Sequence, residues 1–138
     1  MDDEPDFRTA FFWIDVVPLR QAEVVLLGGE LDIRTVDRFA EAVDAAFATG
    51  SGAVIIDIAR VEFFGAVGIH VLARAQLLAV RGGQALRVVV DEQRLIVHML
   101  RVAGMTGRLA LFHELVAAVD AAADAPGDII DFGAAHSG

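Results

Sequence analysis

The sequence has no cysteine, no lysine and no tyrosine, and its 138 residues include only three prolines. The absence of cysteine excludes disulfide bonds, thiolate metal sites and thiol redox chemistry. Without lysine the chain cannot form a phosphate-binding loop that ends in Gly-Lys. Hydroxyl groups are scarce, and none lies in a Gly-x-Ser-x-Gly setting or beside a recognisable base. We therefore predict that the protein is not an enzyme.

Long apolar runs are also missing, although 56% of the residues are hydrophobic and the mean hydropathy is +0.57. A membrane-spanning helix needs about 18 or more apolar residues in succession. The acidic start of the chain, Met-Asp-Asp-Glu-Pro-Asp, does not match a secretory signal. The length suits one domain with one ordinary core. We predict a single soluble, cytoplasmic domain with no membrane partner.

The net charge of −9 lies mainly in the two ends of the chain. Eight of the twenty acidic residues are there: Asp2, Asp3, Glu4, Asp6, Asp120, Asp124, Asp128 and Asp131. The rest of the chain is close to neutral and shows no stripe of basic residues. We therefore predict that the protein does not bind nucleic acid. The histidines, His70, His98, His113 and His136, include no metal-binding spacing. We predict neither a metal nor a cofactor.

The most informative stretch is residues 53 to 72. Its apolar run from Val54 to Ile58, interrupted only by Asp57, is typical of a strand buried on both faces. Residues 60–64 read as a connection with apolar anchors, followed by the small residues Gly65-Ala66-Val67-Gly68 and then by apolar residues at helical spacing. A strand, a tight loop and a helix place the helix N-terminus at the carboxyl end of the strand, where α/β proteins tend to bind other molecules.

Asp57 followed after three residues by Val-Glu-Phe, and then by Gly68, resembles the central motif of the STAS domain, the anti-sigma factor antagonist family. In that family, positions 65 to 68 usually read Asp-Ser-Ser-Gly, and a partner kinase phosphorylates the first serine. That serine falls at Ala66, which has no hydroxyl to accept a phosphoryl group. The resemblance therefore implies the family's fold without its usual switch.

A second match lies at Gly29-Glu30-Leu31-Asp32, followed by Ile33, Arg34 and Thr35 before the first helix. The resemblance implies that residues 32–35 join the partner-binding face beside the loop. An alternative is that Asp32 and Thr35 only cap the helix of residues 36–47, for which Thr35 suits the N-cap position. For Asp57, we expect a carboxylate that accepts backbone hydrogen bonds in the following loop.

The remaining periodicities predict strands at 11–17 and 23–27, the first ending at Pro18 and the second at Gly28-Gly29. Further elements are a strand at 86–90, a helix at 92–103, a strand at 108–112 and a helix at 114–123 with Leu115, Val116 and Val119 inward. In the helix at 92–103 the apolar residues leave only a narrow polar edge: Leu95, Ile96, Met99, Leu100 and Val102. The predicted fold is α/β, a single STAS-like domain whose mixed sheet has the order β-β-α-β-α-β-α-β-α, with helices mainly on one side.

We expect residues 1–9 to be a disordered N-terminus, 10–123 the STAS domain and 124–138 a flexible tail, with docking of Ile129, Ile130 and Phe132 as the alternative. The candidate partner-binding residues are Asp32, Ile33, Arg34, Thr35, Phe64, Gly65, Ala66, Val67, Gly68 and His70. The alternative for the loop at residues 64–68 is that its small residues only let the following helix pack closely on the sheet. The alternative for His70 is that it is an ordinary exposed helix residue.

Two functions follow. The first is a regulator that docks on an ATPase-fold anti-sigma factor and so releases a sigma factor, without a phosphorylation switch at Ala66. The second is a ligand-sensing or scaffold STAS domain in a transporter or multiprotein complex. The sequence leaves open whether the protein forms a homodimer and whether Thr35 or Ser51 takes over phosphorylation.

Overall fold

The computed structural model describes residues 11–90, 94–105 and 109–124. Its order is β1 (Phe12–Leu19), β2 (Ala22–Leu31), α2 (Val36–Ala48), β3 (Ala53–Phe64), α3 (Ala66–Gly82), β4 (Ala85–Val89), α4 (Arg94–Val102), β5 (Ala110–Phe112) and α5 (Leu115–Asp124). This confirms the predicted α/β order. The segments expected to be a disordered N-terminus and a flexible tail lie almost wholly outside the described residues.

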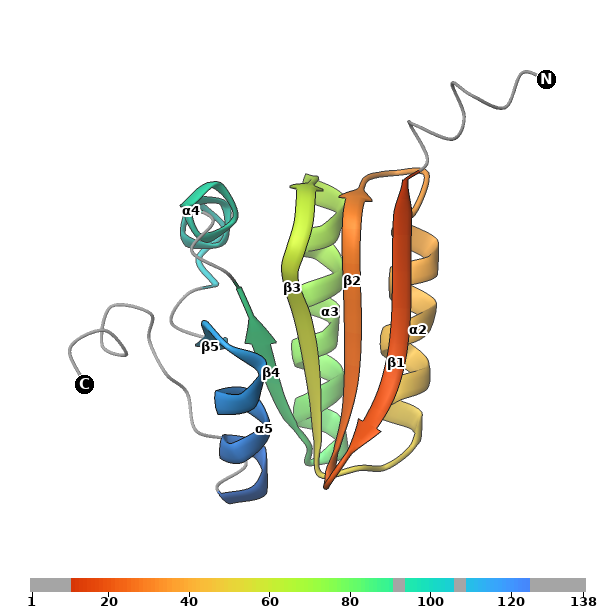
Figure 1. Ribbon diagram of the computed structural model, residues 1–138, viewed down its shortest axis with the longest axis vertical. Helices are drawn as coiled ribbons and strands as arrows, with labels where there is room; N and C mark the ends of the chain where they lie inside the picture. Colours follow the sequence, from red (N-terminus) through yellow and green to blue (C-terminus); the bar gives the residue numbers. More distant parts are fainter. Residues whose placement is uncertain (1–10, 91–93, 106–108, 125–138) are drawn as a thin grey trace.

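The five strands form one sheet in the order β1-β2-β3-β4-β5. β1 and β2 are an antiparallel hairpin, as predicted, and all later pairs are parallel. Parallel neighbours need a crossover connection, and α2 and α3 supply the first two. The carboxyl ends of β2 and β3 therefore meet at one end of the sheet, at the top of Figure 1.

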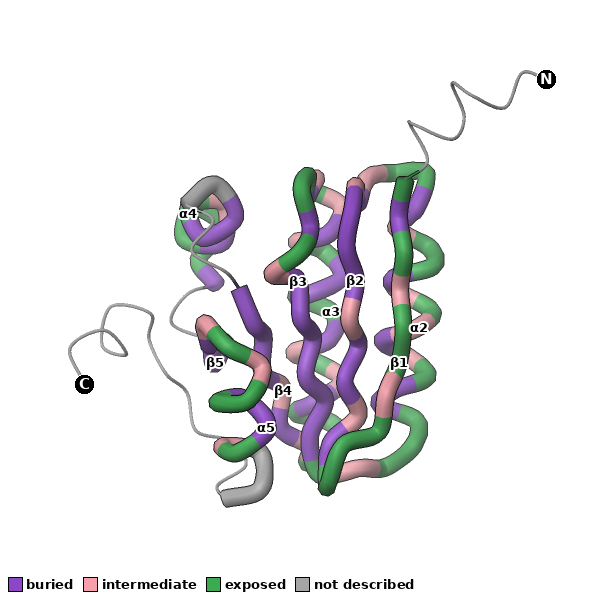
Figure 2. Tube along the Cα trace, viewed as in Figure 1, coloured by how far each residue is buried: buried purple, intermediate pink, exposed green. Residues whose placement is uncertain are grey.

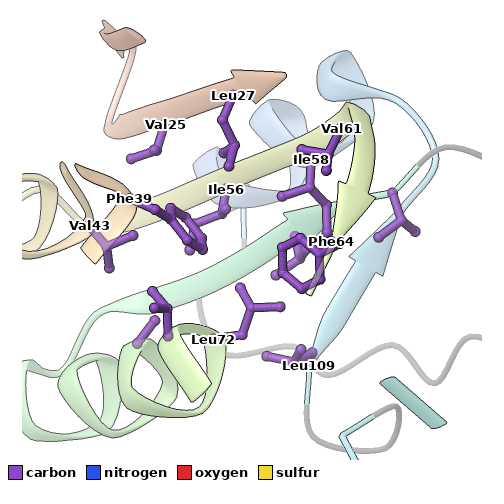
Figure 3. Close-up of a cluster of buried hydrophobic side chains, with 14 of the residues drawn as sticks. Val25, Leu27, Phe39, Val43, Ile56, Ile58, Val61, Phe64, Leu72 and Leu109 are labelled. Atoms are coloured by element: carbon purple, nitrogen blue, oxygen red, sulfur yellow. The ribbon is translucent and has the colours of Figure 1, made fainter. Parts of the chain in front are cut away.

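The main hydrophobic core lies between the sheet and helices α2, α3 and α4. Figure 3 shows Val25 and Leu27 of β2 and Ile56 of β3 facing Phe39 and Val43 of α2. Leu72 of α3 and Ile96 of α4 belong to the same cluster. A smaller cluster on the other face contains Ala118 and Val119 of α5. Helices thus lie mainly on one side of the sheet, as predicted, and α5 is the exception.

Three strands are longer than the sequence pattern predicts. β1 continues through Pro18, which pairs with Glu23; β1 is an edge strand, where a residue without a backbone N–H is tolerated. β2 continues through Gly28 and Gly29, and Gly29 has a positive φ of 89° at a shift of register. These glycines lie inside the strand instead of ending it.

β3 also continues, because the predicted connection at residues 60–64 pairs with β2, in part after a first register shift and in part after a second. Gly28 pairs with Arg60, and Leu31 pairs with Phe64. Such register shifts arise where one strand has an extra residue, and the alternation of apolar and polar residues in the sequence does not predict them.

One residue predicted to face inward is exposed, since Val116 of α5 is 68% exposed. Val119, also predicted inward, is buried against the sheet together with Ala118, and Leu115 packs against them partly buried. In α4 the apolar residues divide between the two sides: Ile96 and Leu100 are buried, and Val102, the last residue, is 73% exposed.

Within the described residues no helix is long and apolar enough to cross a membrane. In the same part of the chain, no three His, Asp or Glu side chains gather as metal ligands would.

We expect Leu72→Ala to lower the free energy of unfolding by about 2 to 5 kcal/mol, because Leu72 is fully buried in the main core. Leu77→Ala is the matched control on the same helix, since Leu77 is 56% exposed. Urea denaturation followed by circular dichroism measures both. Equal losses in the two variants would contradict the placement of α3.

Candidate protein-docking site

The two segments selected from separate motifs lie side by side. Leu31 at the end of β2 pairs with Phe64 at the end of β3, and the segments 32–35 and 65–68 follow these two residues directly. The backbone N–H of Gly65 donates to the carbonyl of Leu31 at 2.8 Å, which joins the segments. Both lie at the carboxyl ends of parallel strands, the usual position of binding sites in open α/β sheets. We call these residues, 32–35 and 64–68 with His70, the docking surface.

Asp32 and Arg34 form a compact charged pair on this surface. The Asp32 carboxylate accepts the backbone N–H of Arg34 at 2.9 Å and also accepts from its guanidinium. The guanidinium of Arg34 lies 3.7 Å from the Glu30 carboxylate. The hydrogen bond from the Arg34 side chain lowers the pKa of Asp32, and the same bond raises the pKa of Arg34. The pair therefore stays ionised at neutral pH.

Ile33, between these two charged residues, has the most exposed large apolar side chain among the described residues, at 78%. An apolar side chain displayed in this way gains free energy only when a partner covers it. The mutual bonding of Asp32 and Arg34 fixes the backbone on either side of it. The segment therefore holds the exposed Ile33 side chain in a fixed position, where a partner could contact it.

Thr35 has a different role from the one predicted. It occupies the N-cap position of α2, but its side chain makes no hydrogen bond to the helix. Its hydroxyl donates to the Glu30 carbonyl at 2.9 Å and accepts the Asp32 N–H at 3.1 Å. Thr35 is only 5% exposed, so it ties the segment to β2 and is no part of the outer surface.

The second segment begins with Gly65, the N-cap of α3 in an extended conformation. The helix starts at Ala66, one residue before the predicted Val67. Ala66 and His70 are exposed and Val67 is half-buried. The N-cap supplies no side-chain hydrogen bond to the first turn of the helix. The positive end of α3 is therefore presented beside Ile33.

Phe64 and Gly68 are buried and hold the segment from below. A Cβ atom on Gly68 would lie 2.6 Å from both the Leu31 side chain and the Phe64 ring. The packing interpretation of the small residues thus holds for Gly68, and it leaves the exposed Ala66 available for contact. Phe63, which the sequence analysis passed over, is 51% exposed next to this segment.

Asp57 lies within β3, and not near its end as predicted. Its carboxylate accepts the backbone N–H of Ala59 at 2.9 Å, where the pairing with β2 shifts register. Asp57 is 3% exposed. Burial raises its pKa, against smaller opposing effects of the Ala59 hydrogen bond and the charge of Arg60. The prediction that the carboxylate accepts a backbone hydrogen bond is confirmed, although the N–H that it accepts belongs to Ala59 in the same strand and not to a following loop.

The fold and this geometry agree with the comparison to known proteins. The family model described as "Mlab, STAS domain" matches residues 15–117. The chain belongs to the STAS domain family. The match includes both segments of the docking surface and every strand of the sheet apart from the first part of β1.

Individual STAS proteins give a similar picture. The chain is 40% identical over 50 residues to the anti-sigma-F factor antagonist RsfB of Mycobacterium tuberculosis, a match that spans 36% of this chain and only 41% of RsfB. An anti-sigma factor antagonist from Mycobacterium paratuberculosis is similar with a TM-score of 0.69 and 27% identity, over 82% of this chain and 95% of that one.

The antagonist SpoIIAA in its unphosphorylated form has a TM-score of 0.65 and 16% identity, over 83% of this chain and 99% of that one. At that identity the likeness concerns the fold alone.

We expect Gly68→Ala to lower the free energy of unfolding by about 1 to 3 kcal/mol, because its methyl group would overlap two buried side chains. Gly52→Ala is the control, since a Cβ there has only an ordinary contact of 3.6 Å with the Gln21 carbonyl. Thermal or urea unfolding compares the two. A neutral Gly68→Ala would mean that α3 is not packed this closely on the sheet.

The raised pKa of Asp57 predicts a pH dependence. A carboxyl with a higher pKa in the folded than in the unfolded state binds its proton better when folded, so its ionisation destabilises the fold as pH rises. The stability of Asp57→Asn relative to the parent protein should therefore increase between about pH 3 and pH 7. Urea denaturation at both pH values measures this difference.

Glu62→Gln is the control, because Glu62 is an exposed carboxyl in the same strand. A constant difference between Asp57→Asn and the parent across the pH range would show that burial of Asp57 does not affect its ionisation.

Proposed function

We propose that this STAS domain, residues 10–123, is a cytoplasmic regulator that docks on an anti-sigma factor and so releases a sigma factor. The observation that carries the proposal is the meeting of segments 32–35 and 65–68 in one exposed surface. The names of RsfB and of the Mycobacterium paratuberculosis antagonist support this function. The expected partner is an anti-sigma factor of the ATPase fold, as the family resemblance implies.

The docking surface has the chemistry of a protein-binding site. Ile33 supplies an exposed apolar anchor, and Arg34 presents a guanidinium held in place by Asp32. Apolar and arginine side chains at the centre of a contact often carry most of its binding energy. The first turn of α3 adds backbone N–H groups and the small exposed side chain of Ala66. A partner can therefore approach the helix end closely.

We further propose that this surface is permanently in its binding form. The resemblance aligns Ala66 with the serine that is phosphorylated in other members, and an alanine cannot receive a phosphoryl group. In members with serine, a phosphate adds a charge of about −1.5 to −2 at this helix end and changes the partner surface. Here the helix end stays uncharged, so binding would be controlled by the amount of the two proteins.

The other two hydroxyls considered for phosphorylation are poorly placed for that role. The Thr35 hydroxyl is buried and bonded to the Glu30 carbonyl. The hydroxyl of Ser51 donates to the Ala53 carbonyl at 3.0 Å, at the start of β3 and thus at the opposite end of the sheet. Neither would place a phosphate on the docking surface without a rearrangement.

A second candidate function is ligand sensing, favoured by an open groove of about 400 Å³ between the C-terminal ends of α2 and α3. Phe47 and Leu78 form its apolar wall, and Arg74 and Arg81 line it. Asp44 already pairs with Arg74 at 2.8 Å. A small molecule with an apolar body and an anionic group would fit this chemistry. Saturable binding of such a molecule in the absence of a protein partner would favour this function.

The test uses the protein as bait in a pull-down from its native lysate, with bound proteins identified by mass, beside Ala66→Asp. We expect the parent to recover an anti-sigma factor and Ala66→Asp to bind it about tenfold or more weakly, because a new negative charge faces the contact. The recovered partner is then purified and its affinity measured by calorimetry.

Val80→Asp is the matched control, since Val80 is 76% exposed near the other end of the same helix, ten residues beyond His70. It adds the same charge and should bind as the parent does. Recovery of no anti-sigma factor, or equal binding by Ala66→Asp and the parent, would overturn the proposed function.

A further inference from the structure

An aromatic surface lies on the face of the sheet that only α5 covers. α5 packs against β3, β4, β5 and the first part of β2, while β1 and the upper part of β2 are not covered by a described helix on this face (Figure 1). Phe11, Trp13 and Phe63 are 46%, 36% and 51% exposed. We call these three residues the aromatic face.

The register of the strands brings these side chains together. Trp13 pairs with Gly28, and a Cβ atom there would lie within 2.6 Å of the indole ring, so the ring lies flat on the glycine. Phe11 lies in the same way against Gly29. Its carbonyl accepts the N–H of Glu30, and Glu30 pairs with Phe63 on the other side. The three rings thus border one stretch of β2.

The surface continues down β1 toward the end of α5. Asp15, Val17 and Leu19 follow Trp13 at intervals of two, which puts all three on the same face of the strand. Leu19 is 37% exposed, and Figure 2 shows β1 as a largely uncovered strand. At the turn after Leu19, the guanidinium of Arg20 lies 3.2 Å from the carboxylate of Asp120 in α5. Apart from Asp15, whose carboxylate accepts the Val16 N–H, this face of β1 carries apolar side chains between the aromatic face and the end near α5.

The chain itself supplies a segment with matching chemistry. Residues 125–138 follow α5 and contain three large apolar residues, Ile129, Ile130 and Phe132, among small and acidic ones. An extended chain spans about 3.3 Å per residue, so the eight residues from 125 to 132 reach up to about 26 Å. The six residue-to-residue steps from Leu19 to Trp13 span about 20 Å of strand. The segment is thus long enough to run along β1 to Trp13.

Other occupants fit less well. Residues 1–10 contain one aromatic residue, Phe7, beside four acids. Pairing of β1 with a second copy is opposed by Pro18 in the edge strand and by Asp15, whose carboxylate accepts the Val16 N–H. We propose that residues 129–132 dock along β1 on the aromatic face and close the uncovered side of the sheet.

The experiment uses Trp13, the only tryptophan of the chain. Its fluorescence emission and its quenching by acrylamide are measured in the full-length protein and in the triple variant Ile129→Ser, Ile130→Ser, Phe132→Ser. We expect the triple variant to shift the emission to longer wavelength and to raise the quenching constant about twofold, because the indole loses its apolar cover. Ala134→Ser with Ala135→Ser is the control and should match the parent.

Equal quenching in the triple variant and the parent would overturn the proposal. Quenching that depends on protein concentration and not on the triple substitution would assign the face to a second copy, and so would also overturn it.

A second measurement locates the contact independently of fluorescence. If the segment covers Phe63, then Phe63→Ser lowers the thermal midpoint in the parent more than in the triple variant, since neighbouring residues are coupled. Additive effects of Phe63→Ser and the triple substitution would contradict docking at the aromatic face. Circular dichroism confirms that each variant is folded.

Discussion

Parallel pairing between β2 and β3 extends from Ala22 beside Ala53 to Leu31 beside Phe64, and the other elements are arranged around it. Two shifts of register within this pairing make β3 longer than β2 without separating their ends. The carboxyl ends of both strands therefore stop at the same level. Segments 32–35 and 65–68 leave the sheet from this point, so the docking surface depends on a pairing that starts at the opposite end of the molecule.

The docking surface is held in place by buried residues that never reach its outside. Thr35 ties the first segment to the carbonyl of Glu30, and Gly68 lets α3 approach Leu31 and Phe64. Both contacts are made within the fold, so the surface needs no partner to take its shape. A preformed surface loses less conformational entropy on binding than a mobile one. This suits a regulator whose surface, as proposed, has no covalent switch.

Periodicity was sufficient to predict the order of the elements, because most helices and strands bury residues at clear helical or strand spacing. Phe39, Val43 and Phe47 mark the inner face of α2 in the sequence as they do in the fold. Strand ends were predicted poorly. Gly28, Gly29 and Pro18 usually end strands, yet here they lie within paired strands because of the indole of Trp13, a register shift and an edge position.

The neighbouring positions of segments 32–35 and 65–68 could be predicted from motifs, whereas the direction of individual side chains could not. Phe63 and Phe64 are neighbours of the same type, and a register shift decides that Phe64 enters the core while Phe63 faces outward. Thr35 suited an N-cap by its type and position, but its hydroxyl donates to the carbonyl of Glu30, five residues earlier in the chain. Neither the strand register nor the direction of this hydrogen bond follows from residue type.

The two faces of the sheet are covered to different extents, and the number of helices on each face explains the difference. α2, α3 and α4 pack on one face, whereas α5 alone packs on the other, where it contacts β2 to β5. A helix with its side chains is about 10 to 12 Å wide, and five strands about 4.8 Å apart span about 19 Å. One helix therefore cannot cover all five strands, and β1 meets the uncovered area with aromatic side chains laid over glycines. That arrangement limits the apolar area exposed to water, and it leaves the surface on which we propose that the C-terminal segment docks.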